Sequence, residues 1–107
     1  MTDTGVDIHL EIARNPQAVA VSAFVSSPFA RTLTWRLVAE SRTAGGTSRV
    51  VQSGVTDGKG AGALGTLAVL ADSQGCVVFT VLENEREIAR TARSIHLDAA
   101  DEGCLTN

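Results

Sequence analysis

The sequence contains few aromatic residues, almost no lysine and little cysteine. None of its 107 residues is tyrosine, four are Phe or Trp, and a single lysine, Lys59, stands against eight arginines. The formal net charge of −3 argues against a general nucleic-acid-binding protein, because such proteins present a basic surface to phosphates. No apolar run approaches the roughly 20 residues that a membrane-spanning helix requires. We therefore expect no nucleic-acid partner and no membrane span.

Metal and cofactor chemistry is also poorly supported. The two cysteines, Cys76 and Cys104, have no CxxC spacing and cannot complete a zinc site alone, and His9 and His96 lie far from any metal-ligand spacing. The cysteines are compatible with a disulfide, with two unpaired thiols or with redox chemistry, and the disulfide is favoured. We expect no metal and no cofactor.

No catalytic arrangement can be recognised, and we expect a protein that is not an enzyme. The sequence has no Ser-His-Asp spacing, no paired-carboxylate site and no HExxH helix. The glycine-rich stretch 57–65 lacks the GxxxxGK[ST] order of a phosphate-binding loop, and a strand follows it where a helix should begin. An ordinary loop is the better interpretation.

Strand patterns dominate the chain. Residues 6–12 alternate strictly between apolar and polar, and similar runs recur between turn signals. The stretches 61–71 and 83–93 could compete as helices, but glycines weaken the first and a hairpin spacing favours a strand in the second. The sequence predicts an all-β domain at 6–97, a seven-stranded antiparallel immunoglobulin-like β-sandwich, between a flexible N-terminus at 1–5 and an acidic polar tail at 98–107. The predicted strands are 6–12, 18–25, 32–42, 48–54, 64–71, 76–83 and 86–97.

Charges are unevenly distributed along this layout. Acidic residues gather in the first strand and the tail, whereas arginines gather in the middle and in the last strand. The third, sixth and seventh strands of such a sandwich share one sheet, so their outward residues should form a basic face. A longer turn before the last strand would pair Thr80 with Arg90 outside and Val81 with Ala89 inside. Two functions are open for this face: solubility alone, or the binding of an anionic or polar partner. The candidate binding residues are Thr34, Arg36, Val38, Arg86, Arg90 and Arg93.

The predicted hairpin of the sixth and seventh strands also determines where Cys76 lies relative to Cys104. It places the end of the seventh strand beside Cys76, and Cys104 follows a few residues later. A bridge between Cys76 and Cys104 would close a loop of roughly 28 residues and stabilise the fold by about 3–4 kcal/mol.

Several stretches resemble the CsgC-like proteins of the curli system, and more closely the alphaproteobacterial branch called CsgH. They are 18–21 leading into 24–25, then 32–37, then 77–81, within a likeness that extends from residue 6 to about 97. The resemblance implies a periplasmic chaperone that stops the major curli subunit from nucleating amyloid, guided by charge on a sheet face. We expect the protein to be a monomer. The CsgC branch has a Cys-x-Cys motif where this chain has Thr32-Leu33-Thr34, so a redox role attached to that motif does not transfer.

The sequence leaves other functions open. An immunoglobulin-like adhesion or assembly module could bind a folded protein by the same face, and a thiol-disulfide enzyme could use the two cysteines. The first residues lack the charged and apolar regions of a signal peptide, which predicts either a cytoplasmic protein or a mature secreted form.

Overall fold

The structure is a computed structural model, and it describes residues 5–60 and 62–95. These residues form seven strands with short connections. The strands are β1 (Asp7–Arg14), β2 (Ala18–Ser26), β3 (Leu33–Thr43), β4 (Gly46–Thr56), β5 (Gly65–Leu70), β6 (Gln74–Glu83) and β7 (Arg86–Ser94).

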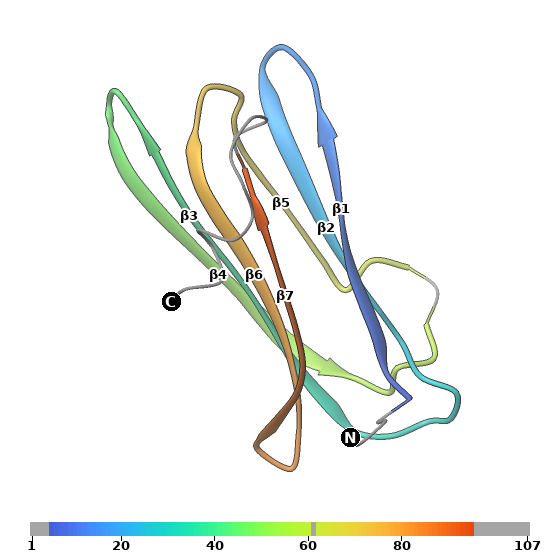
Figure 1. Ribbon diagram of the computed structural model, residues 1–107. Coiled ribbons are helices and arrows are strands. Elements are labelled where there is room, and N and C mark those ends of the chain that lie inside the picture. Colours follow the sequence, from blue (N-terminus) through green and yellow to red (C-terminus); the bar gives the residue numbers. More distant parts are fainter. Residues whose placement is uncertain (1–4, 61, 96–107) are drawn as a thin grey trace.

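The strands pair into two antiparallel sheets that stack against each other (Figure 1). One sheet has three strands in the order β1-β2-β5, and the other has four in the order β4-β3-β6-β7. This arrangement confirms the predicted seven-stranded immunoglobulin-like sandwich and the prediction that the third, sixth and seventh strands share a sheet. The fourth strand joins the same sheet at its edge, beside β3.

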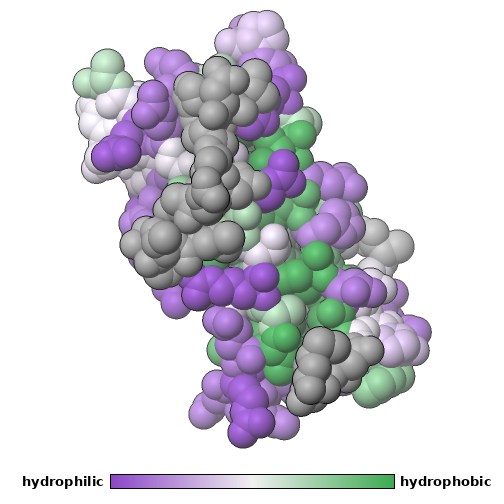
Figure 2. All heavy atoms as spheres, in the orientation of Figure 1, coloured by the Kyte–Doolittle hydropathy of each residue, from purple (hydrophilic) through white to green (hydrophobic). Residues whose placement is uncertain are grey.

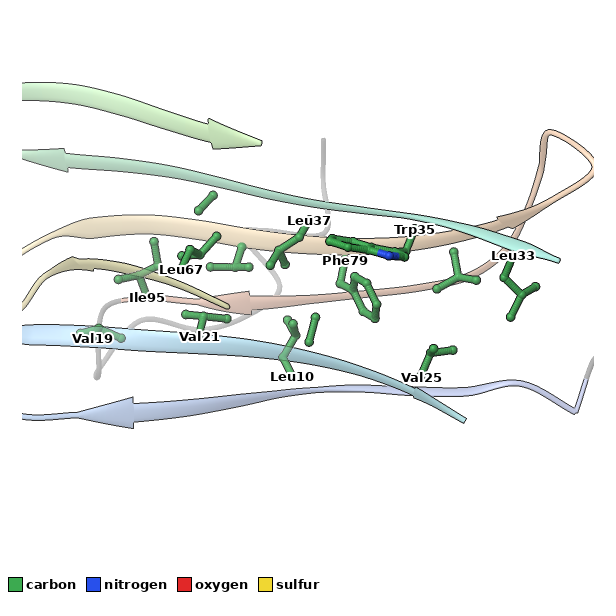
Figure 3. Packing of buried hydrophobic residues seen from close by; sticks show 14 residues of the cluster. Leu10, Val19, Val21, Val25, Leu33, Trp35, Leu37, Leu67, Phe79 and Ile95 are labelled. Carbon is green, nitrogen blue, oxygen red and sulfur yellow. The ribbon is translucent and has the colours of Figure 1, made fainter. Parts of the chain in front are cut away.

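Period-two alternation directs one side of each strand into the core. On β3, Leu33, Trp35 and Leu37 are buried, whereas Thr34 and Arg36 between them are exposed. The predicted division of this strand into core and surface residues is confirmed. Figure 3 shows the buried side chains of both sheets pointing into the space between the two layers of strands. The largest fully buried ones are Phe79, Leu33, Leu37, Ile95, Val21, Val77 and Val81.

The start of β6 lies unusually close to the backbone of β3. Gly75 pairs with Ser41 and has a φ of 152°, in a region that residues with a side chain rarely adopt. A β-carbon added at Gly75 would lie 1.9 Å from the carbonyl oxygen of Glu40. The central β3–β6 pairing therefore requires glycine at this position.

The single tryptophan closes one side of the sandwich, where β4 and β5 face each other. Trp35 is 7% exposed, and its indole packs so closely on Gly54 and Gly65 that a β-carbon at either would lie 3.0 Å from the ring. Gln52 of β4 donates a hydrogen bond of 3.0 Å from Nε2 to the Thr66 carbonyl of β5. Two glycines thus create the space that lets a tryptophan fill this side of the core.

The opposite side of the sandwich lies between β1 and β7. Figure 2 shows a lengthwise band of hydrophobic residues there, with hydrophilic residues on both sides. Partly buried Ile8 and Ile12 of β1 and Ile88 of β7 pack against the core. Arg14 links the two strands at one end by donating a hydrogen bond of 2.9 Å from Nη2 to the carbonyl of Ile95.

The structure changes some predicted boundaries. The fourth strand is longer than the predicted 48–54, because the turn after β3 is short and pairing continues from Gly46 to Thr56. The two stretches weighed as helices contain β5 and all but the last residue of β7 instead. The tail at 98–107 and most of the N-terminus at 1–5 lie outside the described residues, so these domain boundaries stay predictions.

Candidate functional site

The candidate site is the side of the four-stranded sheet that points away from the three-stranded sheet, which we call the outer face. On β3 it carries Thr34 and Arg36, both exposed, and Val38, which is half-buried. These three predicted site residues therefore lie together, at alternate positions of one central strand. The cross-strand partners of Arg36 are Ser53 of β4 and Thr80 of β6.

The β6–β7 hairpin decides which residues of the last strand reach the outer face. Thr80 pairs with Arg90 and Val81 with Ala89, as predicted. The predicted longer turn is wrong, because Glu83 pairs directly with Arg86 across a two-residue loop. The predicted pairing of Thr80 with Arg90 results instead from an irregularity between Val81 and Leu82. Opposite this point β7 accommodates one extra residue, as in a β-bulge.

The two loop residues have left-handed backbone conformations. The φ angles are 54° at Asn84 and 65° at Glu85, as a type I′ hairpin turn requires. Asparagine adopts this conformation readily, whereas glutamate adopts it at a cost. A two-residue turn followed by the bulge thus gives the register that a longer turn was expected to give.

The register brings one of the three predicted arginines of β7 onto the outer face. Arg90 lies beside Thr80, in the same cross-strand row as Arg36. The placement of Arg86 and Arg93 on that face is wrong, because Arg93 pairs with inward-facing Val77 and the bulge reverses the side on which Arg86 projects. Both of these arginines are exposed, but at the edge strand on the side of the core.

Sequence reasoning did not assign β4 to the outer face, although β4 forms its border. Arg49, Val51 and Val55 of β4 project there, and Val55 is 70% exposed. The short turn at 43–46 is the signal that could have revealed this, because a tight hairpin places the fourth strand beside the third.

The outer face carries a surplus of positive charge. Arg49 lies 3.5 Å from Glu40, and Arg90 lies 3.9 Å from Glu87. Arg36 and Arg42 form no ion pair with any residue that the structure describes. Among the residues that the structure describes, four arginines against two glutamates give this face a sign opposite to that of the whole chain.

Another ion pair, which sequence reasoning missed, lies at the end of the sandwich. Arg31 donates to Glu83 from Nε at 2.9 Å and also from Nη2, while its guanidinium lies 5.0 Å from the centre of the Phe29 ring. The hydrogen bonds from Arg31 lower the pKa of the Glu83 carboxyl and raise the pKa of Arg31. Both side chains are more buried than those of the other ion pairs, so this contact fixes the loop before β3 against the end of β6.

Cys76 lies on the outer face, half-buried, between Glu40 of β3 and Ser94 of β7. The predicted proximity of the start of β6 to the end of β7 is confirmed. Cys104 lies outside the described residues, so the disulfide from Cys76 to Cys104 stays a prediction. Cys76 also lines a hollow of about 500 Å³ beside Glu40, Arg42 and Arg49.

Other candidate chemistry is sparse in the described part of the chain. Within residues 5–60 and 62–95, no three His, Cys, Asp or Glu side chains are grouped as a metal site would require. Over the same residues, no helix has the length and hydrophobicity needed to cross a bilayer. His9 is an exposed strand residue, as predicted, and its ring stacks on Phe24 at 4.7 Å between centroids.

The fold and the outer face define a class of protein: an immunoglobulin-like β-sandwich that presents a cationic face from its four-stranded sheet. Among solved structures, the chain is similar to CsgH from R. palustris, with a TM-score of 0.64 and 16% identity over 84% of this chain and 92% of CsgH. It is also similar to the curli protein CsgC from E. coli, with a TM-score of 0.62 and 13% identity over 83% of this chain and 96% of CsgC. No protein-family model and no curated protein sequence matches the chain. The shared fold agrees with the sequence resemblance to CsgC-like proteins.

Proposed function

We propose that this protein is a periplasmic chaperone that inhibits amyloid nucleation of curli-type subunits by transient contact through its outer face. The observation that carries the proposal is Arg36, an exposed arginine on a central strand with no ion pair among the described residues. The fold shared with CsgH and with the curli protein CsgC supports a curli-related role. In this proposal the protein acts as a monomeric binding protein and carries out no reaction.

The physical basis of the proposal is a weak contact between the outer face and client segments, which competes with the stacking of those segments into amyloid nuclei. Amyloid nuclei form when extended segments pair edge to edge and their side chains interdigitate between sheets. A rigid sheet face that repeatedly contacts such segments delays nucleation without holding them. Guanidinium groups suit this task, because they form paired hydrogen bonds with carboxylates while attracting acidic chains from a distance.

The proposal is tested by the kinetics of fibre formation of the major curli subunit, followed by thioflavin fluorescence. A substoichiometric amount of the protein should lengthen the lag phase. Arg36→Glu should shorten that lag, and so should salt raised well above 0.15 M, at which the Debye length is already about 8 Å. Arg86→Glu is the matched control, because it makes the same charge change at an exposed residue away from the outer face. An unchanged lag at equimolar protein would refute the chaperone function.

The alternative is an adhesion or assembly module that forms a stable complex with a folded protein. The exposed side chains of Val51 and Val55 on the outer face favour it, because apolar residues on a flat face suit a lasting interface. A complex that survives size-exclusion chromatography, together with an unchanged lag phase, would support this second function over the first.

A further inference from the structure

Three neighbouring rows of residues cross the outer face from β4 through β3 to β6. The cross-strand partners alternate in chemistry from one row to the next: a largely apolar row, a row in which Arg36 lies between two hydroxyl groups, and a second apolar row. On β7 the middle row continues with Arg90, beside Thr80. The members of these rows are Val55, Thr34 and Leu82; Ser53, Arg36 and Thr80; and Val51, Val38 and Val78.

The spacing of the rows matches an extended polypeptide. Residues on one side of a strand repeat every two positions, which is about 6.6–6.8 Å at the rise of a β-strand. A second strand that is stacked on the outer face and aligned with β3 has the same repeat on the side that faces the protein. Three alternate side chains of that strand would therefore meet the three rows one by one.

Charge determines what the middle side chain should be. Arg36 is exposed, forms no ion pair with a described residue, and lies between two hydroxyl groups that can also donate hydrogen bonds. The next row beyond Val38 contains Glu40, paired with Arg49 at 3.5 Å. An acidic side chain is therefore favoured over Arg36 and disfavoured two rows away, over Glu40.

We propose that the outer face binds an extended segment in which one aspartate or glutamate has an apolar residue two positions before it and another two positions after it. The carboxylate contacts Arg36, and the two apolar side chains lie on the rows of Val38 and Leu82. This inference rests on the proposed function and names the kind of client segment that the outer face selects. It predicts selection by register as well as by charge.

Three capped peptides test the register. The first, Ser-Val-Thr-Asp-Thr-Val-Ser, has the proposed pattern; the second, Ser-Val-Asp-Thr-Thr-Val-Ser, has the same composition with the acid facing the other side; the third has Asn in place of Asp in the first sequence. Titration into isotopically labelled protein, followed by NMR, should shift the resonances of Thr34, Arg36 and Thr80. The first peptide should bind about three- to fivefold more tightly than the other two, which is the size of an exposed ion pair.

Two protein variants test the assigned arginine. Arg36→Gln should abolish the preference for the aspartate over the asparagine peptide. Arg42→Gln should retain that preference, because it removes the same charge from the same side of the same strand, three rows away. Equal binding of the first two peptides, or equal effects of the two variants, would overturn the inference.

The peptide measurements are separable from those of fibre formation. If the peptides bind without preference while the lag phase of the major curli subunit still lengthens, the inference fails and the chaperone function stands. If the peptide preference is found while the lag phase is unchanged, the recognition rule holds and the chaperone function fails.

Discussion

Replacement of Glu85 by glycine is expected to stabilise the protein through the β6–β7 hairpin. Glu85 has a φ of 65°, and a residue with a side chain pays about 1–2 kcal/mol for this conformation. Glycine removes that cost but loses about 0.5–1 kcal/mol more backbone entropy on folding. The net gain should therefore be about 0.5–1 kcal/mol, which raises the melting temperature by about 2–6 °C in a domain of this size.

The matched control is Glu85→Ala, which removes the same carboxylate but leaves a side chain in the left-handed conformation. Urea denaturation of wild type, Glu85→Gly and Glu85→Ala should rank glycine first, with alanine close to wild type. Equal stability of the two variants would show that the loop conformation is not the source of the gain. This turn and the bulge after it set the register of β7. Glycine adopts the same turn conformation, so Glu85→Gly should keep that register, leave Arg90 on the outer face and leave the inhibitory activity unchanged.

Two further predictions concern stability. Gly75→Ala should prevent folding, as judged by circular dichroism, because its β-carbon would lie 1.9 Å from the Glu40 carbonyl oxygen, whereas Gly60→Ala, with nothing within 4 Å, should leave the protein folded. Glu83→Gln should lower the urea midpoint at pH 7 by more than at pH 3. The Arg31–Glu83 contact lowers the folded pKa of Glu83, so its stabilisation is complete above the unfolded pKa of about 4.3 and is lost as the pH falls through the folded pKa. A constant difference between wild type and variant across this range would refute the linkage.

The layers of the fold could be predicted because a period-two pattern marks the strands that supply most of the core. Residues such as Trp35 and Phe79 fall at inward positions whatever the details of the turns, so the core and the division of β3 into two sides follow from the pattern. The length of β4 could not be predicted in the same way. Most of its side chains are exposed or half-buried, so the alternation that identifies a strand is weak there.

The placement of the candidate residues on the outer face was predicted correctly on β3 and only in part on β7, whereas their role in binding stays a prediction. On β3, the side on which each residue projects depends only on alternation within one central strand, and this places Thr34, Arg36 and Val38 on the outer face. On β7, the side on which each arginine projects depends on a bulge, because one extra residue reverses the side on which every residue beyond it projects. The Arg31–Glu83 contact joins residues 52 positions apart, and no local sequence pattern predicts such a pair.

The position of Trp35 makes the protein's own fluorescence a reporter of one side of the sandwich. The sequence has no tyrosine and no other tryptophan, so the emission comes from a single indole enclosed by Gly54 of β4 and Gly65 of β5. Separation of these two strands would hydrate the indole and shift its emission to longer wavelength. A segment lying on the outer face touches the opposite side of the sheet and should leave the emission maximum in place. Binding to that face and opening of the sandwich can therefore be told apart optically, without attaching a label.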